Sequence, residues 1–146
     1  MKSNFRQLRV NQLARALATF EAAKQEARPG RGWLRAIREA LGLTLECVGK
    51  KLGQSRRRIQ EFEEAEAQDR ITLNSLRRVA AAMDCELVYA ILPKSGTISE
   101  LAERRARAQA SEDVLDVEHT MALEDQAVGD VKELIDKETK RRLNKQ

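Results

Sequence analysis

Apolar residues recur every three or four positions along most of this chain, a spacing that is typical of amphipathic α-helices. The pattern is clearest over residues 41–63, where two short apolar-faced segments flank a glycine. Thr44 and Ser55 can cap the two predicted helices, and Gly53 supplies the left-handed residue at which the first helix ends. The inward faces would consist of Leu45, Val48, Leu52, Ile59 and Phe62. Two short helices around a tight turn predict a helix-turn-helix.

Helical spacing continues on both sides of this pair. Residues 4–27 predict a first helix that Pro29-Gly30 ends, and residues 32–41 predict a second helix with Trp33 as a core anchor. Its inward face would consist of Leu34, Ile37 and Leu41. Residues 64–70 are a polar connection, after which Thr72 or Asn74 caps a helix that runs to Met83. Gly49 interrupts the first helix of the pair at a cost of about 1 kcal/mol, so we expect another helix backbone to approach it closely.

Residues 85–92 change character, because they are rich in β-formers and are bounded by Asp84 and Pro93. They predict one strand, and no other stretch resembles a partner strand. Since a lone strand leaves its backbone groups unpaired, we expect it to pair with the same strand of a second subunit across a two-fold axis. The dimerisation residues would be Glu86, Leu87, Val88, Tyr89, Ala90 and Ile91. The alternative is a buried continuation of the preceding helix.

The last third of the chain predicts three more helices after a hinge at residues 94–96. One runs from Ser99 to about Ala110, one starts at Ser111, and the last is capped by Asp130. Because these helices have few large apolar residues, they indicate a docking arm for a partner. The predicted fold class is mainly α: a helix-turn-helix bundle with one β-strand, which is intermolecular, and a C-terminal helical arm. The predicted regions are an N-terminal helix at 1–31, a DNA-binding domain at 32–83, a dimerisation strand at 84–93 and the arm at 94–146.

Charge divides the chain in the same way. Residues 1–93 hold 17 basic and 11 acidic side chains, whereas residues 94–146 hold 10 basic and 12 acidic ones. Within the arm, residues 111–136 hold nine acids and one base, a net charge of −8. A basic body suits a polyanion that an acidic arm would repel, so the two parts are expected to have different partners. The alternative is that both are ordinary solvated helix faces.

Several classes of function are not indicated. No apolar run approaches the roughly 18 residues of a membrane span, and no signal peptide is visible. Cys47 and Cys85 fall in apolar patterns, which favours reduced core residues of a cytoplasmic protein. His119 is the sole histidine, and no glycine-rich phosphate loop follows a strand. We therefore expect no enzyme, no metal and no cofactor.

The exposed start of the second helix of the pair is polar and basic. We expect Gln54, Arg56 and Arg57 to enter the major groove of DNA, where arginine can bond guanine O6 and N7. Phosphate contacts are expected from basic side chains on either side of the turn. The residues expected to contact phosphates are Lys50, Lys51 and Arg58. Ser55, at the turn, completes the predicted DNA-binding set.

Residues 32–83 resemble the Xre/Cro-type helix-turn-helix family. The resemblance rests on Trp33-Leu34-Arg35-Ala36-Ile37-Arg38, followed by Leu43-Thr44, Leu52-Gly53, Ser55 and Ile59. Leu45 stands where that family usually has a glutamine that often lies at the DNA, and Gly49 replaces a small alanine. We expect the arginine run to substitute for the missing glutamine.

A closer resemblance covers nearly the whole chain. The stretches GWLRAIREALGLT, ITLNSLRRVAAAMDCELVYAILP and HTMALEDQAV resemble the mobile mystery protein A family, which is encoded beside a Fic-domain protein in bacteria. The resemblance implies an antitoxin and transcriptional regulator of a toxin–antitoxin pair. Fic proteins commonly transfer AMP from ATP to a hydroxyl group. Their inhibitors carry a helix with Ser/Thr-x-x-x-Glu-Gly/Asn, whose glutamate pairs with an arginine that would otherwise hold the γ-phosphate.

Two stretches of this chain fit the first five positions of that inhibitory motif. Thr120 to Glu124 fits with Asp125 in place of Gly or Asn, and Ser99 to Glu103 also fits. The spacing alone is weakly specific. Position favours Thr120 and Glu124 as the toxin-inhibitory residues, because they lie in the acidic arm and within a family-like stretch. The alternative is an ordinary amphipathic helix with a glutamate in solvent.

The function expected from the sequence is an antitoxin that binds and inhibits a Fic-type AMP-transferase. The same protein would bind operator DNA as a dimeric autoregulatory repressor, with no membrane partner. The first alternative is a plain dimeric Xre-type transcriptional repressor with a structural tail. The second alternative is an adaptor that uses a degenerate helix-turn-helix to bind protein and not DNA.

Overall fold

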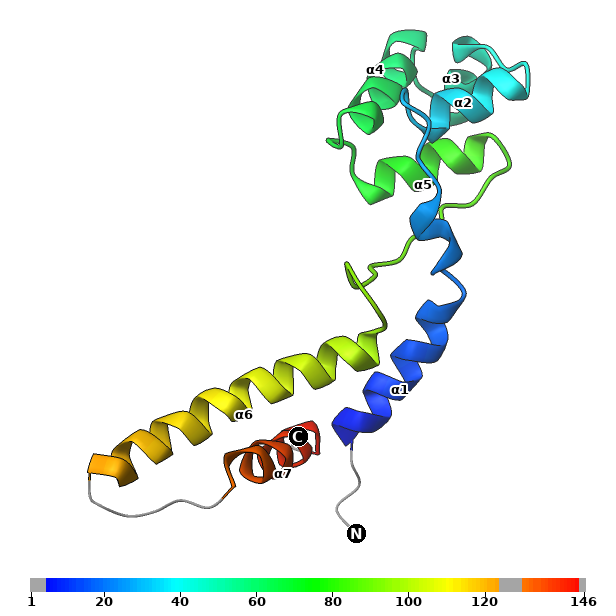
Figure 1. Ribbon diagram of the computed structural model, residues 1–146. Coiled ribbons are helices and arrows are strands. Elements are labelled where there is room, and N and C mark those ends of the chain that lie inside the picture. Colours follow the sequence, from blue (N-terminus) through cyan, green and yellow to red (C-terminus); the bar gives the residue numbers. More distant parts are fainter. Residues whose placement is uncertain (1–4, 124–129, 145–146) are drawn as a thin grey trace. The chain divides into compact units, whose positions relative to one another are not determined.

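The computed structural model describes residues 5–123 and 130–144, and these residues are organised as helices (Figure 1). In chain order the elements are α1 (Phe5–Ala18), the 3₁₀-helix η1 (Ala22–Gln25), α2 (Trp33–Ala40), α3 (Leu45–Leu52), α4 (Arg56–Ala67), α5 (Leu73–Ala82), α6 (Ile98–Leu123) and α7 (Val131–Leu143). The chain divides into two compact units, one spanning Gln25–Tyr89 and the other combining the described residues up to Lys24 with those from Ala90 onwards. The mainly helical fold is confirmed.

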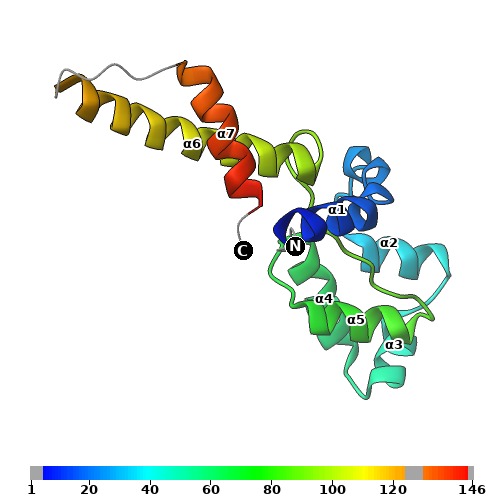
Figure 2. The ribbon, with the colours of Figure 1, turned by 90° about the horizontal axis from the view of Figure 1, so that it is seen from below.

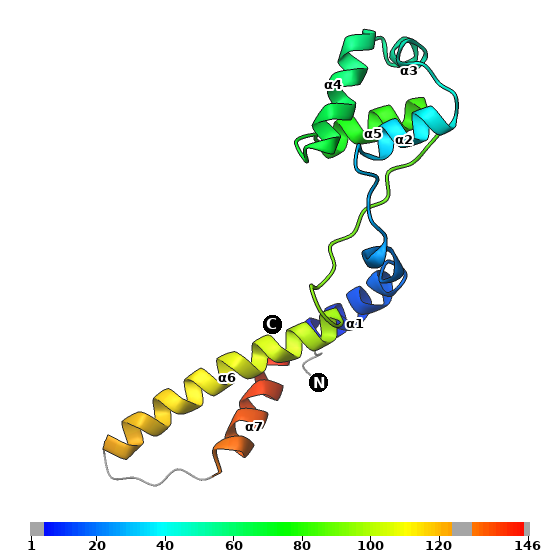
Figure 3. The same cartoon turned by 45° about the horizontal axis from the view of Figure 1, so that its top comes forward.

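The unit of residues 25–89 is a bundle of α2, α3, α4 and α5 around one apolar core (Figure 3). Its core consists of Leu34, Val48, Ile59, Phe62, Val79, Ala82 and Met83. Leu45 packs against this core. Leu45, which stands where the Xre/Cro-type family usually has a glutamine, therefore contributes to the packing of the core.

The helix starts follow the caps that the sequence predicts. The side-chain oxygens of Thr44 and Ser55 each accept a hydrogen bond from the backbone N–H three residues later, at 3.1 Å. Thr72 caps α5 in the same way, which decides between Thr72 and Asn74. Gly53 ends α3 with a φ of +63°, a conformation that glycine adopts at little cost. Thr44 and Gly53 therefore bound α3, and Ser55 and Thr72 fix the starts of α4 and α5.

Gly49 is approached closely, but by the turn and not by another helix. Its carbonyl accepts a hydrogen bond from the N–H of Gln54 at 2.8 Å, which folds the turn back onto α3. A Cβ atom at position 49 would lie 2.5 Å from the Gln54 carbonyl oxygen. Glycine is therefore required at this position by the turn itself.

Gly49→Ala is expected to destabilise the protein by about 2 kcal/mol, because the overlap with a backbone atom outweighs the better helix propensity of alanine. The measurement is urea unfolding followed by circular dichroism. Gly30→Ala is the matched control, since nothing lies within 4 Å of a Cβ at that position. Equal unfolding midpoints for the two variants would contradict the close approach.

Three expectations for this unit are corrected. Trp33 is 50% exposed and is not a core anchor. Leu34 is buried in the core, and the side chain of the adjacent Trp33 is rotated away from it by about 100° around the helix. Leu41 is the exposed C-cap of α2 and does not join its inward face. Residues 64–67 are not a connection, since α4 continues to Ala67 with Glu66 buried. The connection to α5 is correspondingly shorter than the sequence suggests.

The strand predicted at residues 85–92 is absent, and the part of the chain that the structure describes contains no strand. The chain turns at Asp84 with a φ of +57°, and residues 85–88 then lie against α2 and α5. There they line a pocket of about 280 Å³ together with Trp33, Ile37 and Leu76. A strand requires a neighbour for its backbone hydrogen bonds, and one copy of this chain offers none at these residues. Pairing of Glu86–Ile91 with a second copy stays a prediction.

In the second unit α7 packs alongside α6, and α1 also contacts α6 (Figure 2). The predicted break at Ser111 is wrong, because α6 is continuous from Ile98 to Leu123. A serine followed by two acids favours a helix start, but only where the preceding helix has ended, for example at a glycine or proline. No glycine or proline precedes Ser111 within α6, so the helix continues. The start of α7 is confirmed, since Asp130 accepts a hydrogen bond from the N–H of Lys132 at 2.9 Å.

The N-terminal helix is shorter than the pattern over residues 4–27 predicts. α1 ends at Ala18, where the hydroxyl of Thr19 donates to the carbonyl of Ala16 at 3.2 Å and competes with the helical hydrogen bonds.

Ion pairs join α6 to α7. Arg107 and Asp136 lie 2.8 Å apart, and Arg142 pairs with Asp113. Among the helices described here, none is both long and apolar enough to cross a membrane.

Candidate nucleic-acid interface

The first turn of α4 presents three consecutive arginines to solvent. Arg57 has 89% of its side chain exposed, and Arg56 and Arg58 are also exposed. The opposite face of α4 is buried and consists of Ile59, Phe62, Glu63 and Glu66. Burial of that face directs the arginine-bearing start of the helix outward.

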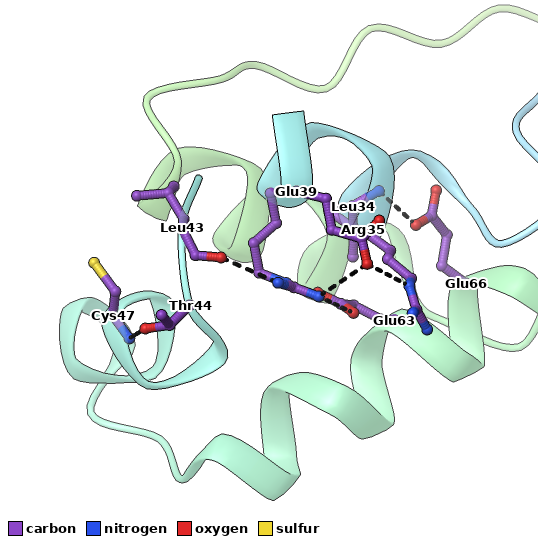
Figure 4. A network of polar contacts seen from close by, with 9 residues as sticks. Leu34, Arg35, Glu39, Leu43, Thr44, Cys47, Glu63 and Glu66 are labelled. Atoms are coloured by element: carbon purple, nitrogen blue, oxygen red, sulfur yellow. Dashed lines mark hydrogen bonds and ion pairs between the residues drawn. The ribbon is translucent and has the colours of Figure 1, made fainter. Parts of the chain in front are cut away.

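A buried ion pair joins α4 to α2 (Figure 4). Arg38 donates to both carboxylate oxygens of Glu63, from Nε at 2.5 Å and from Nη2 at 3.1 Å. The hydrogen bond to Glu63 raises the pKa of Arg38 above its ordinary value, so this guanidinium stays charged. Its Nη1 also donates to the carbonyl of Leu43 at 3.0 Å. One arginine thereby ties α2, α4 and the entry to α3 together.

A second buried carboxylate caps α2. Glu66 accepts hydrogen bonds from the backbone N–H groups of Trp33 at 2.8 Å and Leu34 at 2.9 Å, as Figure 4 shows for Leu34. These N–H groups have no partner within the helix, and a carboxylate also suits the positive end of the helix dipole. Gly32 has a φ of +89°, and a Cβ there would lie 2.6 Å from Glu66 Oε2. The approach of Glu66 therefore requires glycine at position 32.

Sequence reasoning missed both carboxylates. Glutamate is rarely buried, so the sequence assigns Glu66 to the polar connection of residues 64–70 and gives Glu63 no role in the core. The signal that could have found them is their spacing, because residues 59, 62, 63 and 66 follow the i, i+3, i+4, i+7 pattern of one helix face.

Each exposed arginine at the start of α4 contacts a carboxylate. Arg57 Nε lies 3.3 Å from Glu61 Oε1, and Arg58 Nη1 lies 3.1 Å from Glu61 Oε2. Arg56 Nη1 lies 3.4 Å from Glu46 on α3. Arg58 also stacks over the ring of Phe62, with 4.6 Å between its guanidinium carbon and the ring centroid. Arg57 is thus the most exposed of the three, and Arg58 is held along the side of the helix.

The other predicted DNA-binding residues lie on the same exposed stretch, from the last turn of α3 to the start of α4. Lys50, Lys51 and Gln54 are exposed, and Lys51 lies 4.0 Å from Asp84. Ser55 is exposed as well, but its hydroxyl is committed to the N–H of Arg58. The seven residues predicted to bind DNA are therefore all exposed and all lie within residues 50–58.

One of the two predicted toxin-inhibitory residues, Thr120, lies on the other unit. Thr120 is exposed on α6, and its hydroxyl donates to the carbonyl of Asp116 at 2.9 Å. Glu124 lies outside the described residues. Glu103, the glutamate of the competing motif, is exposed near the start of α6.

A groove of about 770 Å³ runs between α6 and α7. Its apolar lining comes from Val114, Val117 and Leu134, and its charged lining from Asp113, Asp116, Lys137, Glu138 and Arg141. The neighbouring Leu115 is exposed. This hairpin therefore leaves apolar surface uncovered.

Comparison with known proteins finds one similarity, in the unit of residues 25–89. The family model described as helix-turn-helix matches residues 34–89, which span α2 to α5 and the segment after α5. This match indicates a DNA-binding transcriptional regulator. No curated protein and no solved structure matches the chain.

Proposed function

We propose that this protein recognises operator DNA through α3 and α4 and represses its own transcription. The observation that carries the proposal is the run of three exposed arginines on the first turn of α4, the helix that follows the turn of a helix-turn-helix. In such motifs the N-terminal residues of the second helix contact base edges. Arg56 and Arg57 are in that position and Gln54 directly precedes the N-cap, while Lys50, Lys51 and Arg58 flank them and suit phosphates.

The proposal includes a dimer. Operators of this class consist of two half-sites about one helical turn apart. Each half-site binds one helix-turn-helix, so the whole operator binds two copies of the protein. Val88, Tyr89 and Ile91, which belong to the predicted pairing segment, are exposed large apolar side chains in a single chain. Their burial against a second copy would remove this apolar surface from water.

The test is binding of the purified protein to its own promoter and to random DNA of equal length across a salt series. We expect the promoter to bind about 10³-fold or more tightly, with affinity falling steeply as salt rises. Sedimentation should show two copies on each operator. Binding that does not depend on salt, or equal binding to both DNAs, would favour the protein adaptor.

The second proposed activity is inhibition of a Fic-type toxin by the acidic arm of residues 94–146. Support comes from the resemblance to mobile mystery protein A, from the net charge of −8 over residues 111–136, and from the groove between α6 and α7. An acidic arm is steered toward a basic nucleotide-binding cleft. In that cleft Glu124 would pair with the arginine that holds the γ-phosphate, since a guanidinium can bond both oxygens of a carboxylate. ATP would then bind unproductively or not at all.

We expect Glu124→Gly to release AMP transfer by the purified pair while the complex stays largely assembled, because the other contacts of the arm persist. The assay is transfer of label from ATP, and Glu103→Gly is the matched control that should leave transfer silent. If Glu103→Gly alone releases transfer, the choice of inhibitory residue is wrong. Failure of the neighbouring gene product to co-purify would leave the plain repressor with a structural tail.

A further inference from the structure

Glu61 contacts two of the three arginines that present themselves to DNA. Its Oε1 faces Nε of Arg57 at 3.3 Å, and its Oε2 faces Nη1 of Arg58 at 3.1 Å. Glu61 is itself exposed, one turn beyond Arg57 on α4. A carboxylate therefore lies on the surface that approaches DNA, at a place where phosphates would repel it.

The atoms in these contacts determine what Arg57 can still do. Glu61 engages Arg57 through Nε, so both Nη groups can donate to another acceptor. Guanine offers two acceptors, O6 and N7, to such a fork and carries no net charge. The ion pair with Glu61 can therefore persist while Arg57 binds guanine, and it restricts the rotation of the guanidinium before DNA arrives.

Random DNA is bound differently, through phosphates alone. A phosphate that approaches Arg57 or Arg58 meets the negative charge of Glu61 within the same few ångströms and is repelled by it, whereas uncharged guanine is not. Such repulsion is modest at an exposed site, but it reduces the gain from each phosphate contact. The carboxylate thus opposes non-specific binding more than guanine recognition.

We infer that Glu61 is a specificity-determining residue of the DNA interface, which orients Arg57 for guanine and weakens phosphate contacts of Arg57 and Arg58. The inference rests on the proposed DNA binding and adds to it a carboxylate that selects operator over random DNA. Glu46 lies 3.4 Å from Nη1 of Arg56 and should weaken the phosphate contacts of Arg56 in the same way.

The experiment compares Glu61→Gln with Glu64→Gln in the full-length protein, on operator and on random DNA. Glu64 carries the same charge on the same helix and is exposed, but its carboxylate accepts from Gln60 at 3.2 Å, and no arginine among the described residues pairs with it. For Glu61→Gln we expect random DNA to bind up to about eightfold more tightly at 0.1 M salt, the gain of roughly one phosphate contact. Its log–log salt dependence should steepen by up to about 0.9. Operator affinity should stay level or fall.

The ratio of operator to random affinity is therefore the readout, and it should drop several-fold for Glu61→Gln alone. An equal drop for Glu64→Gln would overturn the inference, because charge anywhere on the helix would then suffice. Equal tightening on both DNAs would overturn it as well. If the unmodified protein shows no salt-dependent DNA binding, the proposed function itself fails, which is a distinguishable result. Thermal melting of both variants confirms that these exposed positions leave the fold intact.

Discussion

Glu63→Ala is expected to lower the free energy of unfolding of the helix-turn-helix unit by about 3–5 kcal/mol. The carboxylate of Glu63 is 6% exposed and is the ion-pair partner of Arg38, whose side chain is 12% exposed. Removal of the carboxylate leaves a buried guanidinium that keeps a contact of 3.9 Å with the half-exposed Glu39 but has lost both hydrogen bonds to Glu63, and this desolvation cost dominates the loss. Since many domains are stable by only 5–15 kcal/mol, a large part of this unit's stability would be lost. Urea unfolding at neutral pH, followed by circular dichroism, measures it.

The controls separate charge from packing. Glu64→Ala removes an exposed neighbour of the same type and should change the unfolding free energy by at most about 0.5 kcal/mol. Replacement of both partners, Arg38→Met with Glu63→Leu, should recover most of the loss, because an apolar pair of similar volume needs no charge compensation. A double variant as unstable as Glu63→Ala would show that the site requires these side-chain shapes.

The turn geometry of this protein could be predicted because its signals are local. Thr44, Ser55 and Gly53 act within three residues of themselves, through a side-chain oxygen or a left-handed φ, and their roles were confirmed. Such signals do not depend on what lies elsewhere in the fold. The start of the candidate DNA interface was therefore accessible from the sequence.

The buried carboxylates were not accessible in this way, because their partners are distant in the chain. Glu66 binds backbone groups more than 30 residues earlier, and Glu63 binds Arg38, 25 residues away. Composition marks such residues as solvated, and only the apolar residues beside them on the helix face indicate otherwise. The scaffold that positions the arginines was consequently missed, although the arginines themselves were found.

The missing strand and the continuous α6 show that a local sequence pattern alone does not determine secondary structure. Residues 85–92 have strand-like composition, but a strand also needs a neighbour, and in a single chain residues 85–88 lie against α2 and α5 instead. Ser111 has the composition of a helix start, yet a helix that is already formed simply runs through it. In both cases the surroundings override the local preference.

Arg57→Ala is expected to weaken operator binding by about 1–3 kcal/mol and to relax the base preference at one position of the operator. Arg57 is the most exposed of the three arginines, and its contact with Glu61 leaves both Nη groups able to bond a guanine edge. Loss of that fork removes a contact that only one base pair offers, so operator variants at that position should become nearly equivalent. Binding to a panel of single-base operator variants measures this.

Lys51→Ala provides the contrast, because Lys51 is exposed on the last turn of α3 and suits a phosphate. A phosphate contact is the same on every sequence, so this variant should weaken operator and random DNA alike and reduce the salt slope by about 0.9. The two variants therefore differ in kind and not only in size. Should Arg57→Ala weaken operator and random DNA equally, Arg57 would be a phosphate contact, and base readout would pass to Gln54 and Arg56 on the same exposed turn.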